Sequence, residues 1–136
     1  MPRSKLSTPF LAFVVLLGSF AATNGARASC LAGSTGCPIA VHMARGTDTI
    51  VLEGRLTGER DCCVYSFRAR AGQKLYWGLT GVNARAVIID PHGDADGPGL
   101  PNPIPLQWSG EYIFDIHPNL MAEGGYGPFR LTLTIK

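Results

Sequence analysis

Apolar and polar residues alternate along most of the chain after residue 47, and short turn sequences separate the alternating runs. The runs lie at 48–56, 63–68, 74–80, 85–90, 112–116 and 129–135. A period of two places every second side chain on the same face of a strand, and no run outside the first 28 residues has the helical period. The pattern predicts an all-β fold: a single antiparallel β-sandwich of about eight strands, jelly-roll-like, over residues 48–136.

Two stretches interrupt the alternation and predict loops. Residues 91–105 contain five prolines and follow the turn sequence Asp90-Pro91-His92-Gly93. At most a short strand is expected next, at Leu106–Trp108. A second loop is expected at 118–128, before the final strand.

The first 28 residues have the features of an export signal. Arg3 and Lys5 precede a short apolar run at 10–20, and Ala26-Arg27-Ala28 provides a cleavage site between small residues. We therefore divide the chain into a signal peptide at 1–28, a cysteine-containing segment at 29–47 and the sandwich. A lipoprotein acylated at Cys30 is the alternative, although Arg27 stands where an aliphatic residue is required. A periplasmic or secreted protein without stable membrane insertion is expected.

Signal removal changes the charge balance. Without Arg3, Lys5 and Arg27, nine basic residues face ten acidic ones, so the net charge is −1 instead of +2. Nucleic acid is therefore not an expected partner. The stretch 86–129 has six acidic residues and no Lys or Arg. Either these acids form one surface for a basic partner or a cation, or they are scattered solubilising residues.

The four cysteines, Cys30, Cys37, Cys62 and Cys63, are typical of an oxidising compartment and allow three pairings. Neighbouring residues in a strand point to opposite faces, which disfavours a bond between Cys62 and Cys63. We expect each of them to bond to one member of the Cys30/Cys37 pair, in an order that the sequence leaves open. No Cys-x-x-Cys motif indicates a redox or zinc role.

Residue patterns for catalysis or metal binding are weak. His42, His92 and His117 lack metal-ligand spacing, and no Gly-x-Ser-x-Gly motif is present. Calcium binding by the Asp90–Asp96 loop stays open, because its carboxylates could coordinate the ion but no Glu follows at the far end. We expect no enzyme activity, no cofactor and no bound metal.

Five segments carry a resemblance to known exported proteins: "LEGRLTG", "VYSFRARAGQKL", "DPHG", "WSGEYIFDI" and "FRLTLTI". They are similar to pre-peptidase C-terminal domains and resemble still more the exported bacterial inhibitors of g-type lysozyme. The resemblance implies a protein that binds and inhibits a lysozyme, with the g-type favoured. It departs from the family at "HPNLMAEGGYGP", which has no Arg where related proteins often carry an arginine-rich turn.

The resemblance also implies a binding loop. Ser109, Gly110 and Tyr112 match a Ser-Gly-x-Tyr element that enters the lysozyme cleft, where the Ser109 hydroxyl would meet a catalytic carboxylate. Asp94, Asp96 and Glu123 would be rim charges for a basic lysozyme. In the alternative interpretation, Gly110 forms the turn before a strand and Tyr112 is a corner residue.

Two other functions stay open. One is a non-catalytic carbohydrate- or surface-binding module of the cell envelope that uses Trp77 or Trp108. The other is an envelope structural protein without a catalytic target.

Overall fold

The computed structural model describes residues 31–58 and 62–136, which form nine strands and no helix. These residues therefore include no helix that could cross a membrane. The strands are β1 (Ile39–Ala40), β2 (Thr49–Leu56), β3 (Val64–Ala69), β4 (Lys74–Thr80), β5 (Ala84–Ile89), β6 (Ala95–Asp96), β7 (Ile104–Pro105), β8 (Gly110–Pro118) and β9 (Gly127–Ile135). The expectations for the signal peptide and Cys30 lie outside the described residues.

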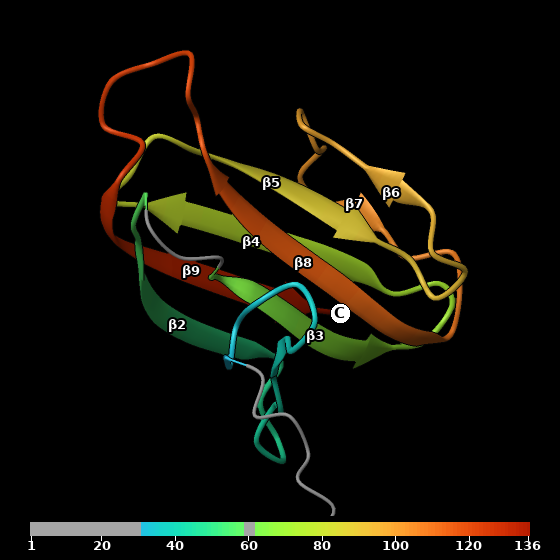
Figure 1. Ribbon diagram of the computed structural model, residues 1–136. Coiled ribbons are helices and arrows are strands. Elements are labelled where there is room, and N and C mark those ends of the chain that lie inside the picture. The colour runs from blue at the N-terminus through green and yellow to red at the C-terminus, as the bar shows by residue number, and fades with distance from the viewer. Residues whose placement is uncertain (1–30, 59–61) are drawn as a thin grey trace, which may run out of the picture.

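The strands form two packed sheets, in the orders β1-β3-β8-β5-β6 and β2-β9-β4-β7 (Figure 1). The first long strand pairs with the last, β2 with β9, and the second pairs with the next-to-last, β3 with β8. This nesting agrees with the predicted jelly-roll-like arrangement and confirms the β-sandwich. β1, which lies before the predicted sandwich at 48–136, joins the five-stranded sheet parallel to β3.

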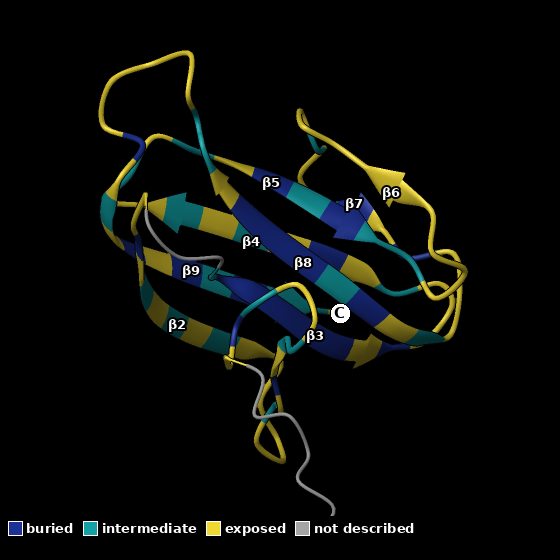
Figure 2. Ribbon diagram, viewed as in Figure 1, coloured by how far each residue is buried: buried dark blue, intermediate teal, exposed yellow. Residues whose placement is uncertain are grey.

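Alternating side chains fill the space between the sheets. In β9, Phe129, Leu131 and Leu133 are buried, whereas Arg130 between them is exposed. Phe114 of the opposite sheet is fully buried, and Figure 2 shows the buried residues concentrated along β3 and β8. The period of two that predicted these strands therefore also identifies the core.

The N-terminal segment covers the edge of the five-stranded sheet. The Val41 N–H donates to the Ser66 carbonyl over 2.7 Å, and the Val64 N–H donates to the Gly33 carbonyl over 2.9 Å. Val64 and Ser66 alternate with the inward residues of β3 but are buried as well, which fits a cover on their outer side. In Figure 1 the segment crosses in front of β3.

The proline-rich stretch contains more pairing than the sequence indicates. The two-residue strands β6 and β7 both lie inside the predicted loop at 91–105. Leu106–Trp108, where the sequence allowed at most a short strand, lies outside the strands, because β7 ends at Pro105. Pairings of two residues are too short to produce a detectable period in the sequence.

The long strands separate two ends of the sandwich. We call the end formed by residues 70–73, 90–94 and 106–110 the Ser109 end (right in Figure 1). The opposite end carries residues 57–58, 81–83 and 119–126. Because β8 runs nine residues from one end to the other, the two ends lie about 25 Å apart at roughly 3.3 Å per residue.

Candidate functional site

Tyr112 is a corner residue. It lies two residues into β8 opposite Phe67, its side chain is 3% exposed, and the two rings stack with centroids 5.5 Å apart. Its hydroxyl donates to the Trp108 carbonyl over 2.6 Å and accepts from the Trp108 N–H over 3.0 Å. Tyr112 therefore holds the segment before β8 from inside, and its buried ring is not a contact surface for a partner.

Ser109 is exposed, but its hydroxyl already has a structural partner. Its Oγ accepts a hydrogen bond from the Ala71 N–H over 2.9 Å. Ala71 belongs to the turn between β3 and β4, so Ser109 joins two connections that are 38 residues apart in the chain. The hydroxyl hydrogen stays available for donation, so Ser109 is compatible with both a structural and a binding role.

Gly110 has a conformation and a contact that exclude other residues. Its φ is +146°, which side chains rarely adopt, and a Cβ at this position would lie 2.9 Å from the Pro91 Cβ. The start of β8 therefore packs directly on the turn that follows β5. This close approach supports the role in chain direction that the sequence assigned to Gly110.

Asp94 and Asp96 line a cavity at the Ser109 end. The cavity, of about 200 Å³, also contacts Asp90, Gln107 and Trp108 on its rim and Ile104 and Leu106 from the core. No Lys or Arg lines this cavity. The structure thus brings Asp94 and Asp96 together with Ser109 and Gly110 at one end.

Glu123 does not belong to this group. It lies in the loop between β8 and β9 at the opposite end, where the Asn83 Nδ2 donates to its main-chain carbonyl over 3.4 Å. The same loop exposes Leu120, Met121 and Tyr126, and it projects beyond the sheets at the upper left of Figure 1. Glu123 is therefore too far away to form a rim around Ser109.

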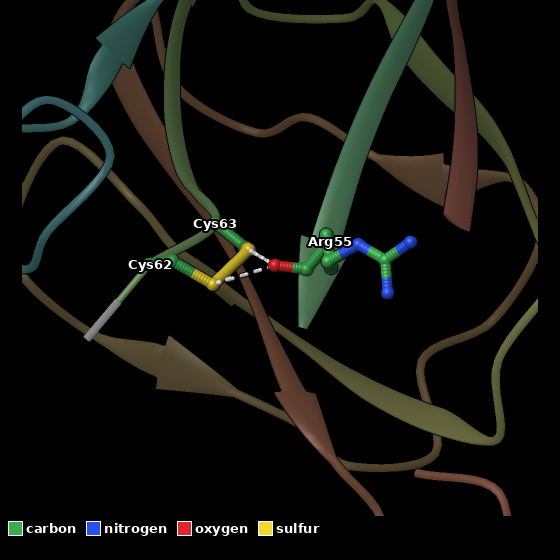
Figure 3. Close-up of a disulfide and its surroundings, with 3 residues drawn as sticks. All are labelled: Arg55, Cys62 and Cys63. Atoms are coloured by element: carbon green, nitrogen blue, oxygen red, sulfur yellow. Dashed lines mark hydrogen bonds between the residues drawn. A yellow bond between two sulfur atoms is a disulfide. The ribbon is translucent and has the colours of Figure 1, made fainter. Parts of the chain in front are cut away.

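The cysteine pairing differs from the prediction. Cys62 is bonded to Cys63, and both sulfur atoms lie against the Arg55 carbonyl oxygen at 3.4 and 3.6 Å (Figure 3). The expected bonds from these two residues to the N-terminal pair are therefore wrong. The prediction assumed a strand, but β3 begins only at Val64 and Cys63 has a φ of +73°. Cys37 is also disulfide-bonded.

The two tryptophans have different environments. The Trp77 indole N–H donates to the Pro101 carbonyl over 2.9 Å, and its ring packs on Phe114, so this residue anchors the proline-rich loop. Trp108 is 47% exposed and contacts the His92 ring edge-on, with centroids 4.6 Å apart. Only Trp108 of the two presents an aromatic surface beside the acidic cavity.

The Asp90–Asp96 loop is organised by its own backbone. The Asp90 Oδ1 accepts from the N–H groups of His92 and Asp94, over 2.8 and 3.0 Å. These bonds form the turn that the sequence predicted after β5. Within 31–58 and 62–136, no three His, Cys, Asp or Glu side chains are grouped as a metal site requires.

Two arginines beside Ser109 were not candidates in the sequence. A second cavity, of about 400 Å³, is lined by Arg68, Arg70 and Gln73 of one chain segment and by Ser109 and Gly110 of another. Arg68 and Arg70 precede Ser109 by about forty residues, so only the pairing of β3 with β8 brings them together. A correct prediction that β3 pairs with β8 would have identified the two arginines.

No family model and no curated protein sequence matches the chain. Solved structures do match it. The chain has the fold of the PliG proteins. These are described as periplasmic lysozyme inhibitors of g-type lysozyme. The protein from Salmonella Typhimurium matches with a TM-score of 0.61 and 22% identity, over 75% of this chain and 100% of that chain.

Two further structures extend the likeness. A mutant of the Escherichia coli PliG protein matches with a TM-score of 0.60 and 21% identity, over 73% of this chain and 97% of that chain. The Aeromonas hydrophila PliG protein matches with a TM-score of 0.54 and 22% identity, over 78% and 100%. The resemblance stated from the sequence motifs is thus confirmed at the level of the fold.

Proposed function

We propose that this protein is exported to the bacterial envelope and there binds and inhibits a lysozyme, with the g-type favoured. The observation that carries the proposal is a fold likeness that spans 97–100% of each PliG chain. The whole inhibitor fold is therefore present here, not a fragment of it. The signal-like sequence at 1–28 and the four cysteines support export. No catalytic function is proposed.

The Ser109 end is the proposed contact surface. Ser109 is exposed there with a hydroxyl hydrogen to donate, and Trp108 adds a half-exposed aromatic side chain. Tyr112 acts indirectly in this proposal, because its two hydrogen bonds fix the Trp108 backbone beside Ser109. A loop that is held in one conformation before binding loses less entropy in the complex.

In this proposal, Asp94 and Asp96 attract the partner electrostatically before contact. They lie at the same end as Ser109, and neither forms an ion pair with the described residues. Uncompensated carboxylates at the rim of a contact surface attract a basic protein and raise its association rate at low salt. Glu123 has no part in this surface.

A carbohydrate-binding module is the second candidate, and Trp108 is the observation that favours it. A half-exposed indole beside Gln107, Asp94 and Asp96 combines a stacking surface with hydrogen-bonding groups. This function would require binding of peptidoglycan fragments by the isolated protein. Inhibition of a lysozyme would not be required.

The test is inhibition of g-, c- and i-type lysozymes by the mature, oxidised protein and by its Ser109→Ala variant. The matched control is Thr57→Ala, which removes an exposed hydroxyl at the opposite end. We expect inhibition of the g-type enzyme that weakens in Ser109→Ala and persists in Thr57→Ala. Thermal unfolding of each variant separates a lost contact from the loss of the bond to Ala71. Absence of inhibition of all three enzymes would overturn the proposal.

A further inference from the structure

Gly78, in the middle of β4, has no structural explanation within the described residues. The strands described there contain four glycines, at Gly54, Gly78, Gly110 and Gly127. Gly110 and Gly127 have a positive φ, and a Cβ at Gly54 would lie 2.5 Å from the Phe129 ring. Gly78 has a backbone outside the left-handed region, and a Cβ there would meet nothing within 4 Å. The pairing of β4 with β9 is regular on both sides of Gly78, so no bulge explains it.

A glycine inside a strand lowers stability, because it loses more backbone entropy on folding and has no side chain to pack. Where no bend or bulge requires it, such a glycine often marks a place where a ligand or another backbone approaches closely. Trp77 and Leu79 on either side of Gly78 pack against the core, whereas Tyr76 and Thr80 are exposed. The space at Gly78 therefore opens on the outer face of the four-stranded sheet.

This outer face carries an aromatic ring and several hydroxyl groups. Tyr76 is 42% exposed and Thr80 is exposed, at two positions before and after Gly78. In β9, Thr132 lies opposite Gly78 and Thr134 lies opposite Tyr76. The hydroxyls of Tyr76, Thr80 and Thr132 form no hydrogen bond within 31–58 and 62–136. An aromatic surface and uncommitted hydroxyls thus surround the position that lacks a side chain.

The charges next to this surface compensate each other. Arg130 lies opposite Thr80 and opposite Glu53, and its Nη2 donates to the Glu53 Oε1 over 2.8 Å. The three residues also line a cavity of about 420 Å³ that continues the face beyond Thr80. Tyr76 and Thr80 lie about 13 Å apart along β4, at roughly 3.3 Å per residue. A long polar surface with locally balanced charge favours an uncharged, extended ligand over a nucleic acid or a strongly charged peptide.

We propose that the outer face of the four-stranded sheet binds a neutral glycan chain, which crosses Gly78 with one sugar ring stacked on Tyr76. The C–H face of a sugar packs on an aromatic ring, and threonine hydroxyls both donate to and accept from sugar hydroxyl and acetamido groups. The inference rests on the proposed export and not on lysozyme inhibition, since the glycan of the bacterial envelope is a chain of N-acetylated amino sugars. The site is separate from Trp108, which precedes β8 of the other sheet.

The variant Gly78→Val tests the proposal, because stability and binding should change in opposite directions. Valine favours strands and its Cβ meets no neighbour, so the guanidinium midpoint should rise. The same side chain occupies the space proposed for the glycan, so calorimetry should show at least about a tenfold loss of affinity for the tetramer of N-acetylglucosamine. Gly78→Ala should cause smaller changes in the same directions. Loss of stability in Gly78→Val, unchanged affinity, or no binding by the wild type would overturn the proposal.

The aromatic contact is tested by Tyr76→Ala. We expect affinity for the same tetramer to fall about tenfold. The matched control is Tyr126→Ala, which removes a 53% exposed tyrosine from the loop between β8 and β9 and should change affinity by about twofold or less. Amide resonances of Gly78 and Thr132 should shift on titration of the wild type. Binding that is lost in Trp108→Ala but kept in Tyr76→Ala would overturn the proposal and assign the glycan to the Ser109 end.

Two further measurements separate a glycan from other occupants of the face. Cosedimentation with purified peptidoglycan should persist at about 0.5 M sodium chloride, because salt screens only charge-mediated adsorption; release by salt would contradict a neutral ligand. Sedimentation velocity should give the same mass for the wild type and Gly78→Val. A wild-type dimer that dissociates in Gly78→Val would overturn the proposal and assign the face to a second copy of the chain.

Failure of this inference and failure of the proposed function are distinguishable. If the wild type binds the tetramer through Tyr76 and Gly78 but inhibits no lysozyme, the inhibitor function is wrong and the glycan site stands. If a lysozyme is inhibited equally by the wild type and Gly78→Val and neither binds the tetramer, the inhibitor function stands and the glycan site is wrong.

Discussion

The hydroxyl of Tyr112 is predicted to stabilise the whole Ser109 end, and Tyr112→Phe removes it alone. The ring keeps its stacking on Phe67, so the change isolates two hydrogen bonds to the Trp108 backbone, of 2.6 and 3.0 Å. A neutral hydrogen bond contributes about 0.5–1.5 kcal/mol net, so the variant should lose about 1–3 kcal/mol of unfolding free energy. In a domain of this size the melting temperature should fall by about 4–15 °C.

The assay is guanidinium unfolding of the mature, oxidised protein followed by circular dichroism. Hydrogen exchange of the Trp108 amide adds a local measurement, because that N–H loses its acceptor and should exchange faster. Tyr126→Phe is the matched control, since Tyr126 is 53% exposed at the opposite end; it should change stability by less than about 0.5 kcal/mol. A Tyr112→Phe variant as stable as the wild type, with an unchanged Trp108 exchange rate, would refute the corner assignment.

Three further changes test other features of the structure. Gly110→Ala should cost about 1–3 kcal/mol, because the left-handed φ and the nearby Pro91 ring both oppose a methyl group; unchanged denaturant midpoints would contradict this. Replacement of Cys62 and Cys63 by Ala should cost only about 1 kcal/mol, since their bond closes a minimal loop, and peptide mapping of the oxidised protein should find the two residues linked together. Burial raises the pKa of Tyr65 above its ordinary value of 10.0. The stability that the neutral Tyr65 side chain contributes is therefore complete below about pH 10, and it is lost as the pH rises through the folded-state pKa. The free energy of unfolding of Tyr65→Phe should therefore fall less steeply than that of the wild type above about pH 10.

The alternation of apolar and polar residues was sufficient to predict the long strands and the sandwich. The final run from Phe129 to Ile135 coincides with most of β9, and the run at 74–80 coincides with β4. These segments bury one face each, so the physical requirement for a core appears directly in the residue order. The two-residue strands β6 and β7 contribute too little buried surface to impose any pattern.

The disulfide prediction failed because it required three-dimensional information. It treated Cys62 and Cys63 as neighbours in a strand, where their side chains point apart. Both cysteines precede β3, which begins at Val64, and Cys63 has a left-handed backbone conformation. The alternation of side chains between the two faces of a strand therefore does not apply to this pair. The N-terminal segment is held to β3 by backbone hydrogen bonds instead, among them the bond from Val41 to Ser66.

The distribution of charge at the candidate site also could not be predicted without the three-dimensional fold. The acidic stretch at 86–129 is continuous in sequence, but the fold divides it: Asp94 and Asp96 lie at the Ser109 end and Glu123 at the other. Pairing of β3 with β8 then brings Arg68 and Arg70, from the basic half of the chain, against Ser109. Two basic neighbours of Ser109 are therefore separated from it by about forty positions in the sequence. Strand pairing thus brings residues from two oppositely charged halves of the chain to one end of the sandwich.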